Sequence, residues 1–424
     1  MTDRFGLLIS GGGIAGNTLA FWLSKLGHDV TVVERFANLR TNGLQLDLRG
    51  HGVQVLKRMG LEQAFRAKQA PEEGMQVVDS SGRRRAFFPA NRTGKGLQAF
   101  TTDYEIMRGD LVRLIHDASK DRVKYIFSNS VKSIENGYNS VQVHFADGKA
   151  DRYDLLVGAD GQGSRTRRMM LGSKSNDGFY PLEGDFVGYF TSPQPITEGE
   201  EYIATMYIAP GRRGIMARRH RPDAIQVYLS CTTDSKRLNE ARQGDVLEEK
   251  AALTEVFQGA GWQTEELLEA LQKSDDFYCQ RMGLVKLDSW FRDRVVLVGD
   301  AAYCPSANTG MGTTSSIVGA YVLAGEIGRH VGGSMSTGEG VKAGLTAALK
   351  AYQDKFQPFM SQVQEGVLED TNDFWKPSSP LGIELMNYAL GAASLLKLDL
   401  LSKWILREDV KGWDLPEYKE ILQN

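Results

Sequence analysis

A glycine-rich turn near the start of the chain constrains its fold more than any other feature. The turn reads Gly11-Gly12-Gly13-Ile14-Ala15-Gly16 and lies between an apolar run, residues 7–10, and a segment with helical apolar spacing, residues 14–26. Gly11 allows a tight bend, Gly13 lets a pyrophosphate approach the backbone, and Gly16 lets the helix pack on the strand. Strand, turn and helix together predict a dinucleotide-binding α/β fold.

The next predicted strand, residues 28–33, ends at Glu34, which is followed by Arg35. A carboxylate at this position accepts hydrogen bonds from both ribose hydroxyls of an adenosine and repels a 2′-phosphate. The backbone N–H groups of Ile14 and Ala15 open the helix and favour phosphate. The first site therefore prefers FAD or NAD over NADP. A glycine turn that binds no nucleotide is the alternative interpretation.

Two later strand-end motifs favour FAD over NAD. Residues 154–159 form a short apolar strand that ends in Asp160-Gly161, and residues 295–298 form another that ends in Gly299-Asp300. Asp300 can hydrogen-bond a ribityl chain, which a simple NAD dehydrogenase does not need to bind. A turn with Gly310, Gly312 and Thr313 then opens a helix whose N-terminus would face a flavin ring and stabilise negative charge on it.

The three motifs, in this order, resemble those of the group A flavoprotein monooxygenases, the family of p-hydroxybenzoate hydroxylase. Within that family, residues 40–48 are similar to the tetracycline-inactivating monooxygenases, and residues 299–306 and 318–321 resemble enzymes that tailor aromatic polyketides. The resemblance covers residues 1 to about 330. It implies an α/β fold of the p-hydroxybenzoate hydroxylase type: a Rossmann-like FAD-binding domain, an inserted α+β substrate domain and C-terminal helices.

The resemblance also implies roles for individual residues. Glu34 would hold the adenosine ribose, Asp47, Arg108 and Asp300 would contact FAD, and Asp160-Gly161 would serve both FAD and the nicotinamide nucleotide. Arg40 matches a position implicated in NADPH handling. The residues alone leave ordinary surface roles open for Arg40, Asp47 and Arg108. The chain departs from the family at Ala307, where a proline is usual. The predicted cofactor contacts are Gly11, Gly13, Ile14, Ala15, Gly16, Glu34, Arg35, Arg40, Asp47, Arg108, Asp160, Gly161, Asp300, Gly310, Gly312 and Thr313.

The region between the second and third motifs has a different character. It is rich in β-branched and aromatic residues, which predicts strands, and it continues into two predicted helices, residues 246–257 and 264–272. We therefore expect three parts, which are listed here with their boundaries. The FAD-binding domain comprises residues 1–71, 101–171 and 281–335; the substrate domain comprises residues 72–100 and 172–280; and the C-terminal helical region comprises residues 340–424.

Candidate walls of a substrate pocket lie on the predicted strands of the second part. They are Tyr189, Met206, Met216 and Tyr228, together with Arg213 from a basic run over residues 211–221. This run is interpreted either as a basic rim for NADPH phosphates or an acidic phenol, or as a hairpin turn with solvated arginines. Plain sheet packing is the alternative for the other four residues.

Composition excludes several classes of protein. Fifty basic and 53 acidic side chains give a net charge of −3, which argues against a nucleic-acid partner. The chain has no apolar stretch long enough for a membrane span, and its first residues run directly into a predicted strand, leaving no room for a signal peptide. Three scattered cysteines provide neither a disulfide framework nor a metal site. We expect a cytoplasmic monomer or weak homodimer.

The predicted function follows from the resemblance. It is an NADPH-dependent (or NADH-dependent) FAD monooxygenase that uses O2 and hydroxylates an electron-rich aromatic or enolic substrate, polyketide- or tetracycline-like, through a flavin 4a-hydroperoxide. Baeyer–Villiger insertion and epoxidation remain open. No catalytic residue is assigned, because the flavin carries the chemistry. The main alternative is a flavin-dependent dehydrogenase or oxidase without monooxygenation, and a flavin-holding protein without turnover is the other. The Trp-x-Trp-x-Ile-Pro element expected of a flavin-dependent halogenase is missing from the sequence.

Overall fold

The computed structural model describes residues 5–40, 43–90, 104–137, 139–172, 176–331, 338–369, 377–396 and 410–422. Thr41 and Asn42, which belong to the segment similar to tetracycline-inactivating enzymes, lie outside the described residues. The same holds for those parts of the predicted domains that fall between the described ranges.

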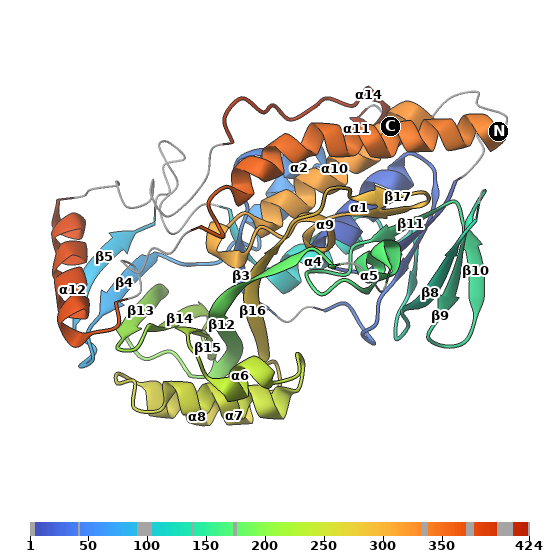
Figure 1. Cartoon of the computed structure of the whole chain (residues 1–424). Helices are drawn as coiled ribbons and strands as arrows, with labels where there is room; N and C mark the ends of the chain where they lie inside the picture. Colours follow the sequence, from blue (N-terminus) through green and yellow to red (C-terminus); the bar gives the residue numbers. More distant parts are fainter. Residues whose placement is uncertain are drawn as a thin grey trace.

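A six-stranded sheet forms the centre of one half of the molecule (Figure 1). All neighbouring strands in it are parallel except β17 and β18, so the carboxyl ends of its parallel strands meet at one edge. The central strands are continuous buried apolar runs, as expected of parallel strands covered on both faces. In spatial order the strands are β17 (Phe291–Arg292), β18 (Val295–Leu297), β11 (Leu155–Gly158), β1 (Gly6–Ser10), β2 (Asp29–Val33) and β7 (Val123–Ile126).

Helices and a small sheet cover the two faces of this sheet (Figure 1). On one face, α1 packs against both α4 and α10, and α10 in turn packs against α2 and α11. On the other face lie α5 and a three-stranded antiparallel sheet. The covering elements are α1 (Ile14–Lys25), α2 (Gly50–Arg58), α4 (Arg108–Asp117), α5 (Arg165–Leu171), α10 (Gly312–Val331), α11 (Gly338–Gln364), β8 (Val131–Asn136), β9 (Val141–Phe145) and β10 (Ala150–Tyr153).

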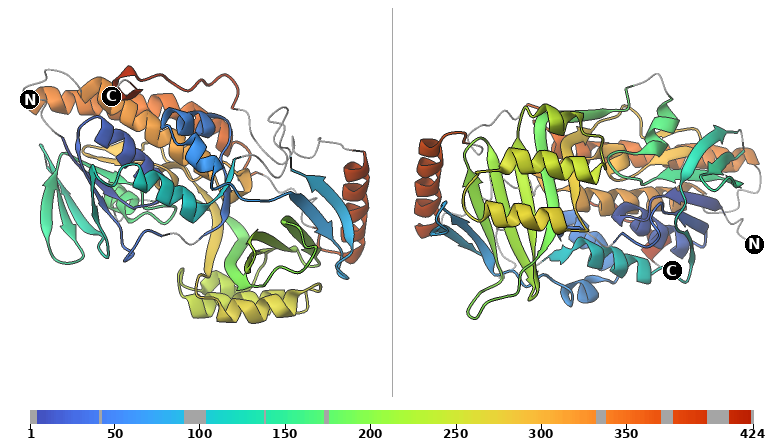
Figure 2. Two further views of the ribbon diagram at one scale, coloured as in Figure 1. Left: turned by 180° about the vertical axis from the view of Figure 1, so that it is seen from behind. Right: turned by 90° about the horizontal axis from the view of Figure 1, so that it is seen from below.

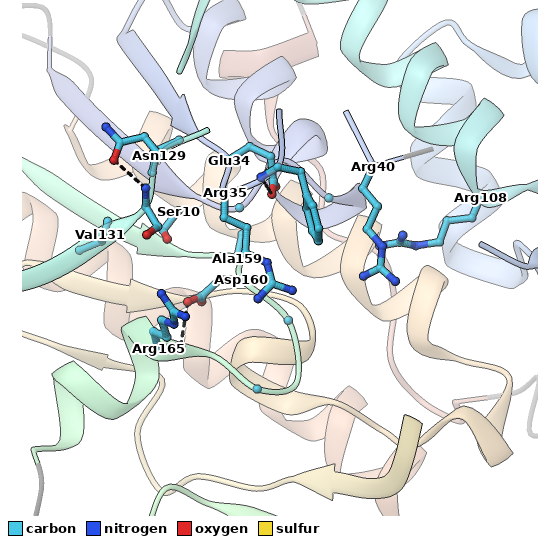
Figure 3. A pocket seen from close by; sticks show the side chains of 17 residues that line it. Ser10, Glu34, Arg35, Arg40, Arg108, Asn129, Val131, Ala159, Asp160 and Arg165 are labelled. Carbon is cyan, nitrogen blue, oxygen red and sulfur yellow. Dashed lines mark hydrogen bonds between the residues drawn. The ribbon is translucent and has the colours of Figure 1, made fainter. Parts of the chain in front are cut away.

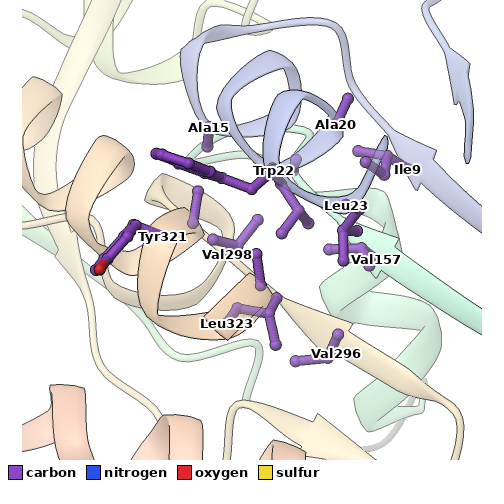
Figure 4. Close-up of a cluster of buried hydrophobic side chains, with 14 of the residues drawn as sticks. Ile9, Ala15, Ala20, Trp22, Leu23, Val157, Val296, Val298, Tyr321 and Leu323 are labelled. Carbon is purple, nitrogen blue, oxygen red and sulfur yellow. The ribbon is translucent and has the colours of Figure 1, made fainter. Parts of the chain in front are cut away.

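The core beneath α1 and α10 fixes these helices on the sheet (Figure 4). Trp22 of α1 is fully buried and meets Tyr321 of α10 edge to face, with ring centroids 5.4 Å apart. Leu23 and Leu323 pack with Val157 and other strand residues in the same cluster. Burial of a large apolar side chain stabilises the fold by about 1.5–3 kcal/mol, so this cluster holds both helices on the sheet.

A seven-stranded mixed sheet forms the second half of the molecule. Only β13 and β4 pair in parallel, and the other neighbours are antiparallel. Helices α7 and α8 cover one face through a separate core that includes Leu253, Phe257 and Leu271 (Figure 2). In spatial order the strands are β16 (Tyr278–Val285), β12 (Phe179–Pro193), β15 (Ala224–Thr232), β14 (Arg213–Arg221), β13 (Ile203–Ala209), β4 (Gly74–Val78) and β5 (Arg84–Pro89); the helices are α6 (Lys236–Glu240), α7 (Val246–Phe257) and α8 (Thr264–Lys273).

Of the helices that the structure describes, α12 (Pro380–Leu395) covers the opposite face of the large sheet, at its β4–β5 end (Figures 1 and 2). There α12 buries Met386 and Leu390 against Val77 and Ala86. In the described part of the chain, no helix combines the length and apolar character needed to cross a membrane. The remaining elements are β3 (Gln45–Asp47), β6 (Glu105–Met107), α3 (Glu62–Arg66), α9 (Asp300–Tyr303), the 3-10 helix η1 (Ala307–Thr309) and α14 (Lys419–Leu422).

This architecture confirms the predicted α/β class with an α+β sheet inserted into it. The basic run is a correction: residues 218–221 belong to β14 and not to a turn. Arg218 and Arg219 alternate between the two faces, and each reaches carboxylates there, so a strand tolerates them. The domain boundaries stay a proposal; one long strand, β16, crosses the proposed boundary at residues 280 and 281.

Candidate functional site

The glycine turn between β1 and α1 is shaped by two close approaches. A Cβ atom on Gly11 would lie 2.5 Å from the carbonyl oxygen of Ala159, and one on Gly16 would lie 2.0 Å from that of Gly11. Both atoms belong to the backbone and cannot move aside. A Cβ on Gly13 would instead meet only the Arg108 guanidinium, at 4.0 Å. Gly13 therefore faces open space at the N-terminus of α1, where a phosphate fits.

Residues that follow four parallel strands line one pocket at the carboxyl edge of the sheet (Figure 3). The structure brings together eight of the predicted contacts there: Gly11, Gly13, Glu34, Arg35, Arg40, Arg108, Asp160 and Gly161. Ligands of open α/β sheets bind at such an edge.

Glu34 is held at the end of β2 by backbone donors. The N–H of Gly12 donates to Oε2 at 2.8 Å, and the N–H of Phe36 donates to Oε1 at 3.1 Å. The residue is only 8% exposed, so its orientation is fixed. Each carboxylate oxygen keeps a further lone pair, which fits the expected bonds from ribose hydroxyls.

Asp160 accepts hydrogen bonds at the start of α5, whose N-cap residue is Ser164. Its Oδ2 accepts the backbone N–H groups of Arg165 and Thr166 at 2.9 and 3.0 Å, and its Oδ1 accepts the Ser164 hydroxyl at 2.5 Å. A carboxylate in this place satisfies free N–H groups and interacts favourably with the helix dipole. The pocket wall beside it comes from Gly161, where a Cβ would meet nothing within 4 Å.

The third motif lies where β18 leads into α9. A Cβ on Gly299 would come within 2.7 Å of Cβ of Ala15, so this turn packs directly on the first turn of α1. Burial raises the pKa of the Asp300 carboxyl, and the positive charge of Arg108 opposes that shift. Gly310 adopts the left-handed conformation (φ +66°) just before α10.

The N-terminus of α10 is open on its outer side. A Cβ on Gly312 would meet nothing within 4 Å, and Thr313 beside it is half-buried. The hydroxyl of Thr314 accepts the backbone N–H of Arg49 at 3.0 Å, which places the segment after β3 against this helix start. Asp47, predicted to contact the cofactor, accepts a hydrogen bond from Nε of Arg49 at 3.0 Å. Ala307 begins η1, so the position where the family has proline is a turn of 3-10 helix.

Arg108 connects the parts of the site. It begins α4, its side chain packs against Gly43, its guanidinium faces Gly13, and its charge acts on Asp300. Arg40 lies near it, with its guanidinium carbon 5.0 Å from the ring centroid of Tyr278. Burial lowers the pKa of Arg40, and the charge of Arg108 adds to the effect. Two neighbouring guanidinium groups make this end of the pocket attractive to phosphate.

The pocket residues that were not predicted include Asn129, Ser130 and Arg165. Asn129 and Ser130 follow β7, the edge strand beside β2, and Arg165 is the first residue of α5. Asn129 and Ser130 could have been found from the rule that strand ends share one edge. Asn17 was also missed. Its side-chain amide donates to the carbonyls of Gly12 and Gly13 at 2.6 and 3.0 Å and so braces the turn.

The predicted substrate residues divide between the two faces of the large sheet. Tyr189, Met206, Met216 and Tyr228 lie opposite the face that α7 and α8 cover, and Met216 pairs with both Met206 and Tyr228. Arg213 lies on the helix-covered face instead, where its guanidinium donates to the carbonyls of Pro210 and Val256 at 2.7 and 2.9 Å. The structure therefore does not bring Arg213 together with the other four.

The geometry of the sheet edge and its pocket defines a dinucleotide-binding flavoprotein of the α/β class. Comparison with known proteins is consistent with this: the FAD-binding domain family matches residues 5–365. The chain belongs to this family of FAD-binding oxidoreductases.

Similar proteins narrow the class. An FAD-dependent monooxygenase of Sarocladium schorii is 51% identical over 98% of this chain and 99% of its own length. A flavin-dependent monooxygenase of Phoma sp. is 40% identical over 92% of this chain and 91% of its own length. The crystal structure of tetracycline destructase Tet(51) is similar over 98% of this chain and 100% of its own, with a TM-score of 0.76 and 29% identity. The predicted family, the FAD-dependent monooxygenases, is confirmed.

Proposed function

We propose that this protein is an NADPH-dependent FAD monooxygenase that hydroxylates an electron-rich aromatic or enolic substrate of polyketide- or tetracycline-like chemistry. The observation that carries the proposal is a run of aromatic rings leading from the dinucleotide pocket onto the large sheet. Tyr278, beside Arg40, stacks on Tyr189 with centroids 4.8 Å apart, and Tyr189 meets Tyr228 edge to face at 5.4 Å. Such rings favour a flat aromatic ligand.

One similar protein supports the same substrate class, because Tet(51) is a tetracycline destructase. The names of the two relatives, both monooxygenases, support the type of reaction. The four candidate residues Tyr189, Met206, Met216 and Tyr228 combine aromatic and thioether side chains, which adapt to flat apolar ligands. We infer that they line the substrate side of the site.

Bound FAD would supply the difficult chemistry, taking reducing equivalents from a nicotinamide nucleotide and activating O2 for oxygen transfer. The chain's own residues would bind and orient. Glu34 would accept the ribose hydroxyls, and the N-termini of α1 and α10 would face negatively charged groups. Arg40 and Arg108 would attract the phosphates of both nucleotides. The glycine positions fit this role, because Gly13 and Gly312 leave room where a Cβ would otherwise stand.

The test is oxygen transfer from O2. With holoenzyme, NADPH and a panel of phenols and enolic polyketides, we expect at least one compound to accelerate NADPH oxidation and to gain one labelled oxygen atom from ¹⁸O2. If no compound gains label and hydrogen peroxide accounts for all NADPH consumed, the monooxygenase proposal fails.

The second candidate, a dehydrogenase or oxidase, differs in the source of electrons. It would reduce FAD anaerobically with the substrate alone, without any nicotinamide nucleotide. The positively charged end of the pocket, with Arg35, Arg40 and Arg108, favours the monooxygenase, because a second phosphate-bearing nucleotide needs such charge. Cytoplasmic location and a monomeric or weakly dimeric state stay predictions.

A further inference from the structure

A buried group of charged side chains joins the two-stranded sheet of β3 and β6 to the open face of the large sheet. Arg218 of β14 donates to both carboxylate oxygens of Glu72 at 2.7 Å and to Oε2 of Glu105 at 3.2 Å. The side-chain amide of Gln45 donates to the same Oε2 at 2.5 Å. The carboxylates are almost fully buried, with 1% and 3% of the Glu72 and Glu105 side chains exposed.

This cluster lies beside the candidate substrate residues. Arg218 stands two positions after Met216 on β14, so both side chains project from the same face of the sheet. Their cross-strand partners on β15 are Gln226 and Tyr228. The side-chain oxygen of Gln226 accepts the backbone N–H of Gln45 at 3.1 Å. The cluster therefore borders the sheet face that carries Met216 and Tyr228.

Among the described residues, the carboxylates of Glu72 and Glu105 share the guanidinium of Arg218. Asp47 faces Glu105 from β3 and is paired with Arg49. Burial raises the pKa of Glu105 to about 8, and the charges of Asp47 and Glu72 add to this, whereas Arg218 opposes it. Tyr228 beside Arg218 remains a neutral phenol at neutral pH, because burial raises its pKa to about 12. Glu105 is thus the group in the cluster that exchanges a proton near pH 8.

The cluster also lacks hydrogen-bond donors that a ligand could supply. Oε1 of Gln45 is buried and accepts no hydrogen bond from the residues that the structure describes, although Gln45 is only 6% exposed. The side-chain N–H groups of Gln45 and Arg218 both donate to Oε2 of Glu105. A buried oxygen without a donor costs about 1–3 kcal/mol, which a bound hydroxyl would recover.

We propose that Gln45, Glu105 and Arg218 form the subsite that holds an ionisable hydroxyl of the substrate, and that Glu105 carries the proton of that hydroxyl. The O–H bond of the phenol or enol breaks as the proton bonds to the Glu105 carboxylate, and the electron pair stays on the substrate oxygen. Arg218 faces the resulting negative charge. The inference rests on the proposed function, since an aromatic or enolic substrate is what supplies such a hydroxyl.

Loss of the proton would have a chemical consequence. An ionised oxygen donates electron density to the conjugated ring or alkene carbons, and these carbons then react faster with an electrophilic oxygen. Proton transfer is most effective when donor and acceptor have similar pKa values, and an ordinary phenol, with a pKa of about 10, lies about two units above Glu105. The same proton can return to the product oxygen, so the step is balanced without a further reactant.

Ligand binding without turnover tests the subsite. Phenols and enolised β-diketones, each paired with its O-methyl ether, would be titrated into FAD-loaded protein without NADPH and followed by flavin absorbance. Methylation should weaken binding about tenfold or more, because the ether can neither donate to Gln45 nor pass a proton to Glu105. The bound complex holds one shared proton, so affinity should fall where both groups are protonated and where both are ionised. One limb of this bell-shaped profile should lie near pH 8.

Three variants separate the role of Glu105 from general damage. Glu105→Gln retains the shape of the side chain but cannot take up a proton, so its pH profile of ligand affinity should lose the limb near pH 8. Glu105→Asp retains a carboxyl group, so its pH profile should still have such a limb. The control is Glu200→Gln, because Glu200 pairs with Arg219 at 2.7 Å on the opposite face of the same strand. This control should keep the wild-type profile. Flavin content after desalting reports whether each variant is folded.

Several results would overturn the inference. These are equal binding of hydroxyl compounds and ethers, no binding of any hydroxylated probe, or a Glu105→Gln profile equal to that of wild type. If Glu105→Gln does not fold, the ether comparison in the wild-type protein still decides. If oxygen transfer is observed together with any of these overturning results, the subsite alone is wrong. If no oxygen transfer occurs but the binding profile is as predicted, the proposed function alone is wrong.

Discussion

Gly13 and Gly16 stand three residues apart on one turn, yet a methyl group would act on them in opposite ways. At Gly16 it would lie 2.0 Å from a backbone oxygen, and at Gly13 it would enter space that a phosphate would fill. Gly13 also has an ordinary negative φ of −79°, which alanine adopts without strain.

We therefore predict that Gly13→Ala folds with nearly wild-type thermal stability but binds FAD at least tenfold more weakly. Gly16→Ala should lower the stability of the protein without cofactor by about 1–3 kcal/mol or more, as overpacking does. Thermal denaturation and FAD titration of both variants check this. Equal loss of stability in both would contradict the different roles of the two glycines.

Glu105 makes a second prediction at the scale of the residue. Its carboxyl has a pKa of about 8 in the folded protein and an ordinary lower value when unfolded. As the pH rises, the unfolded chain releases this proton at a lower pH than the folded protein does. The contribution of Glu105 to the free energy of unfolding is therefore complete below the ordinary pKa and is lost as the pH rises towards 8. Across that interval, the free energy of unfolding should decline more steeply in wild type than in Glu105→Gln. The free energy of unfolding would be measured by urea titration at a series of pH values. Equal declines in the wild type and in Glu105→Gln would contradict this role of Glu105.

At the scale of the element, Asp160 shows how a motif can serve the fold as well as a ligand. Its carboxylate accepts two backbone N–H groups at the start of α5. We expect Asp160→Ala to destabilise the protein by about 1–2 kcal/mol, and Asp160→Asn to cost less, because the asparagine oxygen can still accept the two backbone N–H groups. Chemical denaturation measures both. If Asp160→Ala keeps full stability and loses only cofactor binding, the structural role of Asp160 is wrong.

The sequence predicts elements far better than it predicts contacts between them. Residues 246–257 were predicted as a helix and form α7 with the same ends, because apolar periodicity is local. Glu34 was placed at its strand end for the same reason. The Arg218 cluster was missed, since its partners Glu72 and Glu105 lie 146 and 113 residues away. Charged residues in a row look like a solvated turn when their partners are so distant.

At the scale of the whole molecule, the C-terminal segment, residues 410–422, contacts α10 and α11 and stabilises their arrangement. Glu326 of α10 is fully buried and accepts hydrogen bonds from Lys355 of α11 at 2.5 Å and from Tyr418 at 2.6 Å. A Cβ on Gly325 would lie 2.2 Å from the Tyr418 ring, so the ring packs directly against the backbone of Gly325. One carboxylate thus joins three segments that are far apart in sequence.

Tyr418→Phe should lower the free energy of unfolding by about 1–3 kcal/mol, because Glu326 loses a buried donor. Removal of residues 410–424 should cost more, since it also uncovers the apolar surface beneath the ring. Thermal unfolding of the FAD-loaded proteins measures the difference. Wild-type stability of the truncated chain would show that this segment does not hold the helices.

The central claim is that strand ends and helix starts converge on one FAD site. The visible absorption spectrum of purified protein, recorded after incubation with FAD and desalting, tests it most directly. We expect the wild-type protein to show flavin bands that correspond to equimolar FAD and to release FAD on denaturation. Gly13→Ala should retain little flavin. A folded wild-type protein that stays colourless after this treatment would contradict the claim.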